Sequence, residues 1–352
     1  MSFLHISGPS APAPMGQGRV GILLVNLGTP DDTGFSGVRR YLSEFLSDQR
    51  VIEASPALWQ PILQGIVLTV RPRRSGAAYR RIWNEERNES PLRTYTREQA
   101  ERLTMRFSDE TVSVVWGMRY GTPSVAQAVE ELMTAGCDRI LCMPLYPQYS
   151  ATTTATANDQ LFRFLMKLRR QPAIRTLPAF ADHPAYIKAL AGTTRQTLAT
   201  LSTPPQMIVT SFHGLPNEYV AKGDPYRTDC ERTVAALRTA MGMTEDDMPL
   251  TFQSRFGPAK WLEPYTAPFI AGLPARGIRR IAVIMPGFMA DCIETLDEIG
   301  NEVRAEFLAA GGEELTLIPC LNGSPEAIDL LEALARSELQ GWIVNSSTQS
   351  ER

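Results

Sequence analysis

The stretch VGILLVNLG at residues 20–28 is almost entirely apolar and ends in a glycine. Its length and its Val, Ile and Leu content are typical of a strand buried on both faces of a parallel sheet. Four later stretches have the same character: VSVVWGMRY (112–120), RILCMPLYP (139–147), QMIVTSFHG (206–214) and RRIAVIMPG (279–287). The sequence therefore predicts a protein whose core is built on buried strands.

Amphipathic helical patterns lie between these strands. Two of them, residues 124–136 and 228–242, end at Gly136 and Gly242, and glycine is favoured just after a helix. Strands that alternate with helices favour parallel sheets covered on both faces, and ligands bind such sheets at the carboxyl ends of the strands. We therefore expect an α/β fold with its site in the loops that follow the strands.

Two pairs of strand ends repeat along the chain. VNLGTP (25–30) matches TSFHGLP (210–216), and RILCMP (139–144) matches RIAVIMP (280–286). The spacing between the members is longer in the first half, and an insertion at about 41–90 accounts for most of the difference. This pattern predicts two Rossmann-like halves with an insertion in the first.

The repeat also suggests domain boundaries. We expect a flexible N-terminus at 1–18, rich in Pro, Gly and Ser, and a polar tail at 343–352. The first domain is expected at 19–172, completed by a C-terminal helix within 306–342, and the second domain at 173–305.

Composition narrows the partners and the compartment. The chain carries 35 Lys and Arg against 38 Asp and Glu, so there is no electrostatic case for nucleic acid. Five cysteines without a C-x-x-C pattern argue against a disulfide framework. The N-terminus lacks the features of a secretory signal, and no apolar run is long enough to span a bilayer. We expect a cytoplasmic protein.

Residues 58–70, LWQPILQGIVLTV, are the most apolar part of the insertion and precede the basic RPRR at 71–74. They fit a buried helix. They equally fit an exposed apolar lip over an apolar ligand or a membrane surface, which would make the protein peripheral to the membrane.

His213 is the histidine best placed for chemistry. His5 lies in the N-terminal segment, and His183 in ADHPAY is typical of a helix cap before a first-turn proline. His213 follows a predicted strand, where a pocket is expected. A histidine at a strand end is, taken alone, more often structural than catalytic.

The segment GFMADCIETLDEIGNE at 287–302 carries a row of acids. Asp291 is a candidate N-cap, with Glu294 three residues later as in a capping box. Glu294, Glu298 and Glu302 share one face of a helix at a spacing of four residues. Such a row is either a solvated face or a path for metal ions or protons.

Seven motifs, taken in order, resemble the ferrochelatase family. They are LLVNLGTP (23–30), YRRIWNEERNESPL (79–92), WGMRYGTPSV (116–125), PLYPQYSATTT (144–154), VTSFHGLP (209–216) with KGDPY (222–226), QSRFGPAKWLEP (253–264) and MPGFMADCIETLDEI (285–299). The resemblance implies two Rossmann-like domains, with parallel four-stranded sheets flanked by helices and a porphyrin cleft between them. It implies insertion of Fe²⁺ into protoporphyrin IX to form protohaem, the terminal step of haem biosynthesis.

The resemblance also implies roles for individual residues. His213 is the cleft histidine and Glu294 the facing carboxylate, both catalytic and metal-binding, while Asp291, Glu298 and Glu302 form an acidic relay. The porphyrin-binding positions are Leu27, Arg80, Ser90, Arg119, Tyr120, Tyr146, Trp261 and Phe288.

Two departures from the family pattern bear on the metal. Cys292 stands where some relatives carry a second histidine, so the expected ligand set is leaner. Ala151 stands where relatives with a [2Fe–2S] cluster carry a cysteine, and near the C-terminus there is only Cys320. We expect no such cluster and no cofactor beyond the iron substrate.

Two alternatives stay open at this stage: a chelatase for coproporphyrin, and a non-catalytic porphyrin or haem carrier. The expected partners are porphyrin and ferrous iron, with peripheral membrane contact and transient contact with the preceding pathway enzyme as further candidates.

Overall fold

Two parallel four-stranded sheets form the centre of the molecule. The computed structural model describes residues 18–108 and 111–343. The first sheet has the order β2-β1-β3-β4. Its strands are β1 (Arg19–Gly28), β2 (Val112–Tyr120), β3 (Cys137–Pro144) and β4 (Ala173–Thr176). The predicted flexible N-terminus and polar tail lie almost entirely outside the described residues.

The second sheet repeats the first in its connectivity. Its order is β6-β5-β7-β8, so β1 corresponds to β5 and β3 to β7. Its strands are β5 (Met207–His213), β6 (Leu250–Gln253), β7 (Arg280–Ile284) and β8 (Glu314–Leu317). These are the pairs of strands that the sequence repeat matched, and the predicted α/β fold with two Rossmann-like sheets is confirmed.

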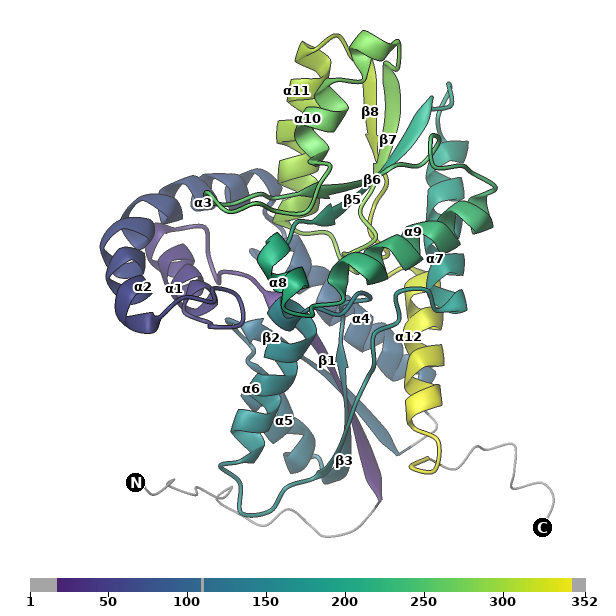
Figure 1. Ribbon diagram of the computed structural model, residues 1–352. Coiled ribbons are helices and arrows are strands. Elements are labelled where there is room, and N and C mark those ends of the chain that lie inside the picture. Colours follow the sequence, from purple (N-terminus) through teal and green to yellow (C-terminus); the bar gives the residue numbers. More distant parts are fainter. Residues whose placement is uncertain (1–17, 109–110, 344–352) are drawn as a thin grey trace, which may run out of the picture.

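Helices flank both sheets (Figure 1). Those near the first sheet are α4 (Pro91–Arg106), α5 (Val125–Thr134), η2 (Ala151–Ala155), α6 (Thr156–Leu165) and α12 (Pro325–Glu338). Those near the second are α7 (Pro184–Ala199), α8 (Asn217–Ala221), α9 (Tyr226–Met241), α10 (Thr266–Ala271), η3 (Pro274–Arg276), η4 (Glu294–Val303) and α11 (Arg304–Ala309).

The boundaries predicted from the sequence need two corrections. Strand β4 begins at Ala173, beyond the predicted end of the first domain, yet it pairs with β3 in the first sheet. Strand β8 lies inside the segment expected to complete the first domain, yet it pairs with β7. Both strands have four residues at the edge of a sheet, and such short edge strands carry little periodic signal.

The insertion forms a helical lip that projects to the left in Figure 1. It comprises α1 (Phe35–Leu46), α2 (Pro56–Ile62), η1 (Leu63–Val67) and α3 (Leu68–Ile82). Leu63 and Leu68 are buried, whereas Leu58 and Val70 are 73% and 69% exposed. The exposed-lip interpretation is therefore correct for one face of this segment.

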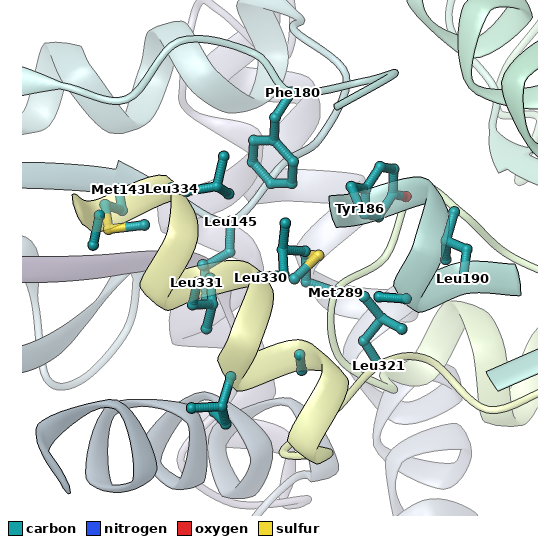
Figure 2. Packing of buried hydrophobic residues seen from close by; sticks show 14 of the residues in the cluster. Met143, Leu145, Phe180, Tyr186, Leu190, Met289, Leu321, Leu330, Leu331 and Leu334 are labelled. Carbon is teal, nitrogen blue, oxygen red and sulfur yellow. The ribbon is translucent and has the colours of Figure 1, made fainter. Parts of the chain in front are cut away.

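One hydrophobic core connects the two sheets. Buried residues of the first sheet, such as Leu141, belong to the same cluster as Ile208 and Ile284 of the second. Figure 2 shows Leu330, Leu331 and Leu334 of α12 packed into this cluster. Helix α12 packs on α4 near the first sheet and on α7 near the second, so it joins both halves, whereas the sequence predicted that it would complete the first domain alone.

Candidate active site

His213 is the last residue of β5 and is half-buried. Its Nδ1 lies 2.7 Å from the carbonyl oxygen of Gly214. A carbonyl oxygen only accepts hydrogen bonds, so Nδ1 carries the proton of the neutral ring. The lone pair of Nε2 is therefore left for a proton or a metal ion.

Gly214 allows Trp261 to pack closely beside this histidine. The Gly214 N–H donates to the carbonyl oxygen of Gln253 at 2.7 Å. A Cβ at Gly214 would lie 2.7 Å from that oxygen and 3.0 Å from Trp261 Cε3, so glycine is required. The Trp261 and His213 rings stand 6.4 Å apart between centroids. The structure thus places these two predicted site residues beside each other.

Residues at the end of β6, the strand that pairs with β5, donate hydrogen bonds to the carboxylate of Glu298. His213 and Gln253 are register partners on β5 and β6. Gln253 Nε2 donates to Glu298 Oε2 at 3.2 Å, and the Ser254 N–H donates to Oε1 at 2.8 Å. The Ser254 hydroxyl also donates to Oε2. The backbone of Ser254 is left-handed, with φ of 65°, which turns both of its donors toward this carboxylate.

Burial raises the pKa of the Glu298 carboxyl. The Ser254 hydrogen bond, the His213 charge and the Gln253 hydrogen bond each act to lower it, while the Glu294 charge acts to raise it. The carboxyl therefore holds its proton to higher pH than an ordinary glutamate does, which suits a group that passes protons.

Glu294 is the first residue of helix η4, and its charge affects the pKa values of the nearby tyrosines Tyr41 and Tyr79. Burial raises the pKa of Tyr79, and the Glu294 charge raises it further. The pKa of Tyr41 is raised by burial and then by Tyr79 and Glu294, with smaller contributions from Tyr120 and Tyr146. Two predicted porphyrin positions, Tyr120 and Tyr146, therefore share one environment with Glu294.

Helix η4 is a π-helix, which the sequence did not predict. The predicted capping box is also wrong, because the helix begins at Glu294 and Asp291 does not cap it. Asp291 Oδ1 accepts from the Thr295 hydroxyl at 2.9 Å, and Oδ2 accepts from Asn322 Nδ2 at 2.6 Å. Helices of this kind are rare and are frequent at functional sites.

Glu302 lies at the far end of η4, where its side chain is 51% exposed. Arg81 of the lip donates to Glu302 at 3.4 Å and to Asp297 through two hydrogen bonds of 2.6 and 2.5 Å. The acidic helix is therefore tied to the lip by an arginine. The row of acids runs from the interior at Glu294 to solvent at Glu302.

Arg119 and Tyr120 form a buried polar cluster at the end of β2. Both donate to the carboxylate of Asp48, which also accepts from the Thr156 hydroxyl. A surface hollow lined by Arg119 and Asp48 opens beside the lip helix α1. Arg119 and Tyr120 thus donate to the same carboxylate, that of Asp48, and this contact joins the lip to the first sheet.

The remaining predicted porphyrin positions occupy varied environments. Leu27 packs between the core of the first sheet and the lip, and Phe288 packs on α4 beside Cys292.

Ser90 is buried and caps α4 by accepting from the Arg93 N–H. Arg80 is exposed and donates to the carbonyl of Thr33. Tyr146 is buried, and its hydroxyl has no hydrogen-bond partner among the described residues.

Cys292 is buried beside Glu294. Burial raises the pKa of its thiol, and the Glu294 charge adds to this effect. A neutral thiol is a weak metal ligand. Within residues 18–108 and 111–343, no three His, Cys, Asp or Glu side chains gather closely enough to cage a metal ion.

Several residues of the site were missed by sequence reasoning. They are Tyr41, Tyr79, Arg81, Asp297, Gln253 and Ser254. Five of them, all but Tyr41, lie inside quoted motifs, so the signal was present, but only the fold shows which side chains of a motif face the acids.

Two parallel four-stranded sheets flanked by helices give the chain a chelatase-like α/β fold. Two solved structures share this fold. SirB from Bacillus subtilis with Fe³⁺ aligns with a TM-score of 0.54 at 11% identity, covering 91% of this chain and 95% of that one. The cobalt complex of the sirohydrochlorin chelatase SirB from Bacillus subtilis subspecies spizizenii has a TM-score of 0.51 at 10% identity, with 92% and 96% covered.

The chain belongs to the ferrochelatase family, whose model, described as Ferrochelatase, matches residues 19–339. A protein of Gluconobacter oxydans named Ferrochelatase is 66% identical over 342 residues, covering 97% of this chain and 99% of the relative. A protein of that name from Mesorhizobium japonicum is 57% identical over 332 residues, covering 94% of each. The chain is thus an enzyme of haem biosynthesis, a lyase that inserts ferrous iron into protoporphyrin to form protohaem. The coproporphyrin alternative is not favoured.

Proposed function

We propose that His213 accepts protons from the porphyrin and that His213 and Glu294 together deliver the iron. The hydrogen bond from His213 Nδ1 to the Gly214 carbonyl carries this proposal, because it leaves the lone pair of Nε2 available. A neutral imidazole is well matched to accept a proton near pH 7. Imidazole and carboxylate bind Fe²⁺ moderately, so the ion is held and then released.

The reaction exchanges two pyrrole N–H protons for one Fe²⁺ ion. The lone pairs of a flat macrocycle point into the ring plane, so the ring must bend before the metal can bind from one face. Binding energy from the rest of the porphyrin provides this strain. The half-buried side chains of Leu27, Trp261 and Phe288 are suited to hold the ring, and the buried Tyr146 belongs to the same cluster as Leu27.

The acids of η4 would carry the released protons, or the hydrated iron, between the site and solvent. Glu298 is half-buried at the His213 end, and Glu302 is exposed at the other end. Asp291 is hydrogen-bonded to Thr295 and Asn322, which favours a holding role rather than transfer.

Anaerobic metalation of protoporphyrin IX tests this assignment. The purified protein is mixed with Fe²⁺ or Zn²⁺, and metalloporphyrin formation is followed by absorbance. Nitrogen and oxygen ligands choose weakly among divalent ions, so we expect both metals to be inserted. Porphyrin binding without turnover, in the wild type and in His213→Ala alike, would instead support the carrier alternative.

The lip is proposed to dock on a membrane surface. Leu58, Ile62, Ile66 and Val70 are exposed at a spacing of four residues, beside the exposed Arg73 and Arg74. An apolar stripe with flanking cations suits the interface of an anionic bilayer. Among the described helices, none has the length and apolarity to cross one. This location would place the apolar substrate and product near the lipid, and contact with the preceding pathway enzyme would occur at the same face.

The protein is proposed to work without an iron–sulfur cluster. All five cysteines are buried and free in the structure. Ala151 begins η2, where its N–H donates to Asp224 at 2.7 Å. An assay for acid-labile sulfide on the purified protein tests this, and stoichiometric sulfide would contradict it.

A further inference from the structure

The side-chain amide of Gln253 joins the second sheet to the acidic helix. Its Nε2 donates to the backbone carbonyl of Glu294 at 2.8 Å and to Glu298 Oε2 at 3.2 Å. Its Oε1 accepts from the Ser211 hydroxyl at 2.7 Å. We propose that Gln253 is a positioning residue for iron delivery, which fixes the first turn of η4 and the Glu298 carboxylate in register with His213. This inference rests on the roles proposed above for His213, Glu294 and Glu298.

The network allows only one orientation of the amide. Both N–H groups of Nε2 point at acceptors, namely a carbonyl and a carboxylate. A flipped amide would place its oxygen against those two acceptors, and both contacts would be repulsive. Gln253 is 4% exposed, so water cannot compensate for the lost hydrogen bonds.

Buried hydroxyl groups hold the amide from behind. The Ser211 hydroxyl lies 2.8 Å from that of Thr266, which lies 2.8 Å from that of Thr251. The Thr251 hydroxyl donates to the Thr210 carbonyl at 2.9 Å. Because these residues lie on β5, β6 and α10, the amide is fixed to the rigid part of the fold. Satisfied buried networks of this kind specify a single geometry.

The position of Gln253 in the sheet connects this network to the reaction. It is the register partner of His213, and its carbonyl accepts from the Gly214 N–H. Gln253 therefore holds the end of β5, which carries His213, through its backbone. Its side chain holds helix η4, which carries the acids. The side chain of Gln253 is hydrogen-bonded to Ser211, Glu294 and Glu298, so a change there should affect iron rather than porphyrin.

The test is Gln253→Met, which keeps the length of the side chain and removes its hydrogen bonds. We expect the KM for Fe²⁺ to rise about tenfold, the effect of losing one hydrogen bond to a carboxylate. The KM for protoporphyrin should stay within about twofold. Calorimetry without porphyrin should show Zn²⁺ binding weakened by a similar factor, because this readout does not depend on turnover.

Gln148→Met is the matched control, because Gln148 is also a buried glutamine and its Nε2 donates to Thr233 at 2.8 Å. It should lower stability without changing the ratio of the two KM values. Ser211→Ala is the milder variant should Gln253→Met fail to fold. It removes the donor to Gln253 Oε1 together with the hydroxyl contact to Thr266 but keeps the amide, and we expect a rise of about threefold in the KM for Fe²⁺.

The outcomes separate this inference from the roles on which it rests. If the KM for Fe²⁺ is unchanged in Gln253→Met and Ser211→Ala but rises in Glu298→Ala, the positioning role of Gln253 is wrong and the relay role of Glu298 stands. If Glu298→Ala also keeps it, the proposed role of the acids fails as well. Equal rises in both KM values for Gln253→Met would indicate general loosening and would overturn the inference.

Discussion

Arg81 of the lip and Asp297 of η4 lie 216 residues apart in the chain and form an ion pair with two hydrogen bonds. The Asp297 side chain is 4% exposed, whereas that of Arg81 is 46% exposed. The lip is therefore attached to the acidic helix by an ion pair between the buried carboxylate of Asp297 and the more exposed guanidinium of Arg81.

Replacement of Arg81 should loosen this attachment. We expect Arg81→Met to lower the free energy of unfolding by about 1–3 kcal/mol, because Asp297 keeps its charge without a cation. Urea unfolding measures the change. Arg80→Met is the control, since Arg80 is exposed and donates only to the carbonyl of Thr33, and it should cost under about 0.5 kcal/mol. Equal losses in the two variants would argue against a specific role for the ion pair.

His213→Ala should abolish most of the turnover. Loss of a general base costs roughly 10²–10⁴ in rate, and here a metal ligand is lost with it. His183→Ala is the matched control, because the His183 Nδ1 accepts from the Ala185 N–H at the start of α7. That variant should lose about 1 kcal/mol of stability and keep its turnover. Retained turnover in His213→Ala would remove His213 from the mechanism.

The two ends of the acidic row should differ in importance. Glu298→Ala should lower turnover strongly, because this carboxylate is half-buried and held by Ser254 and Gln253. Glu302→Ala should have a smaller effect, because Glu302 is half exposed and water can replace it. Steady-state metalation rates measure both. Full turnover and metal affinity in both variants would exclude the relay.

The raised pKa of Glu298 predicts how stability depends on pH. Because its folded-state pKa lies above the unfolded value of about 4.3, the protonated form is favoured by folding. The stability that Glu298 contributes is complete below that pH and is lost as pH rises through the folded-state pKa. Glu298→Gln should remove this dependence in urea unfolding measured across a pH series. An unchanged pH dependence would show that another group causes it.

The exposed lip predicts binding to lipid. The protein should co-sediment with vesicles that contain an anionic phospholipid, and less so with neutral vesicles. Leu58→Gln combined with Ile66→Gln should weaken this binding while leaving metalation in detergent intact. Vesicle binding that is unchanged in the double variant would place the contact elsewhere.

The shared core predicts that the two domains unfold together. Leu331 of α12 is fully buried in the cluster that joins both sheets. Leu331→Ala should cost about 2–5 kcal/mol and move a single unfolding transition. Leu308→Ala, at a position that is 41% exposed, should have little effect. Two separate transitions would show that the domains are energetically independent.

The long central strands and the helices between them could be predicted from sequence, since each is a run of local periodicity. β1, β2, β5 and β7 were predicted within a few residues, and the repeat correctly matched β1 with β5. The short edge strands β4, β6 and β8 were not, because four residues at a sheet edge gain their structure from pairing with a neighbour.

The sequence by itself determined the family and the two-sheet fold, because these depend on local pattern and on motif order. Only the tertiary structure showed the contact of the His213 Nδ1 with the Gly214 carbonyl, the hydrogen bonds of Gln253 and Ser254 to Glu298, and the Arg81 pair with Asp297. These are contacts between segments far apart in the chain. Their partners are selected by how the sheets and the lip pack, and no local spacing encodes that.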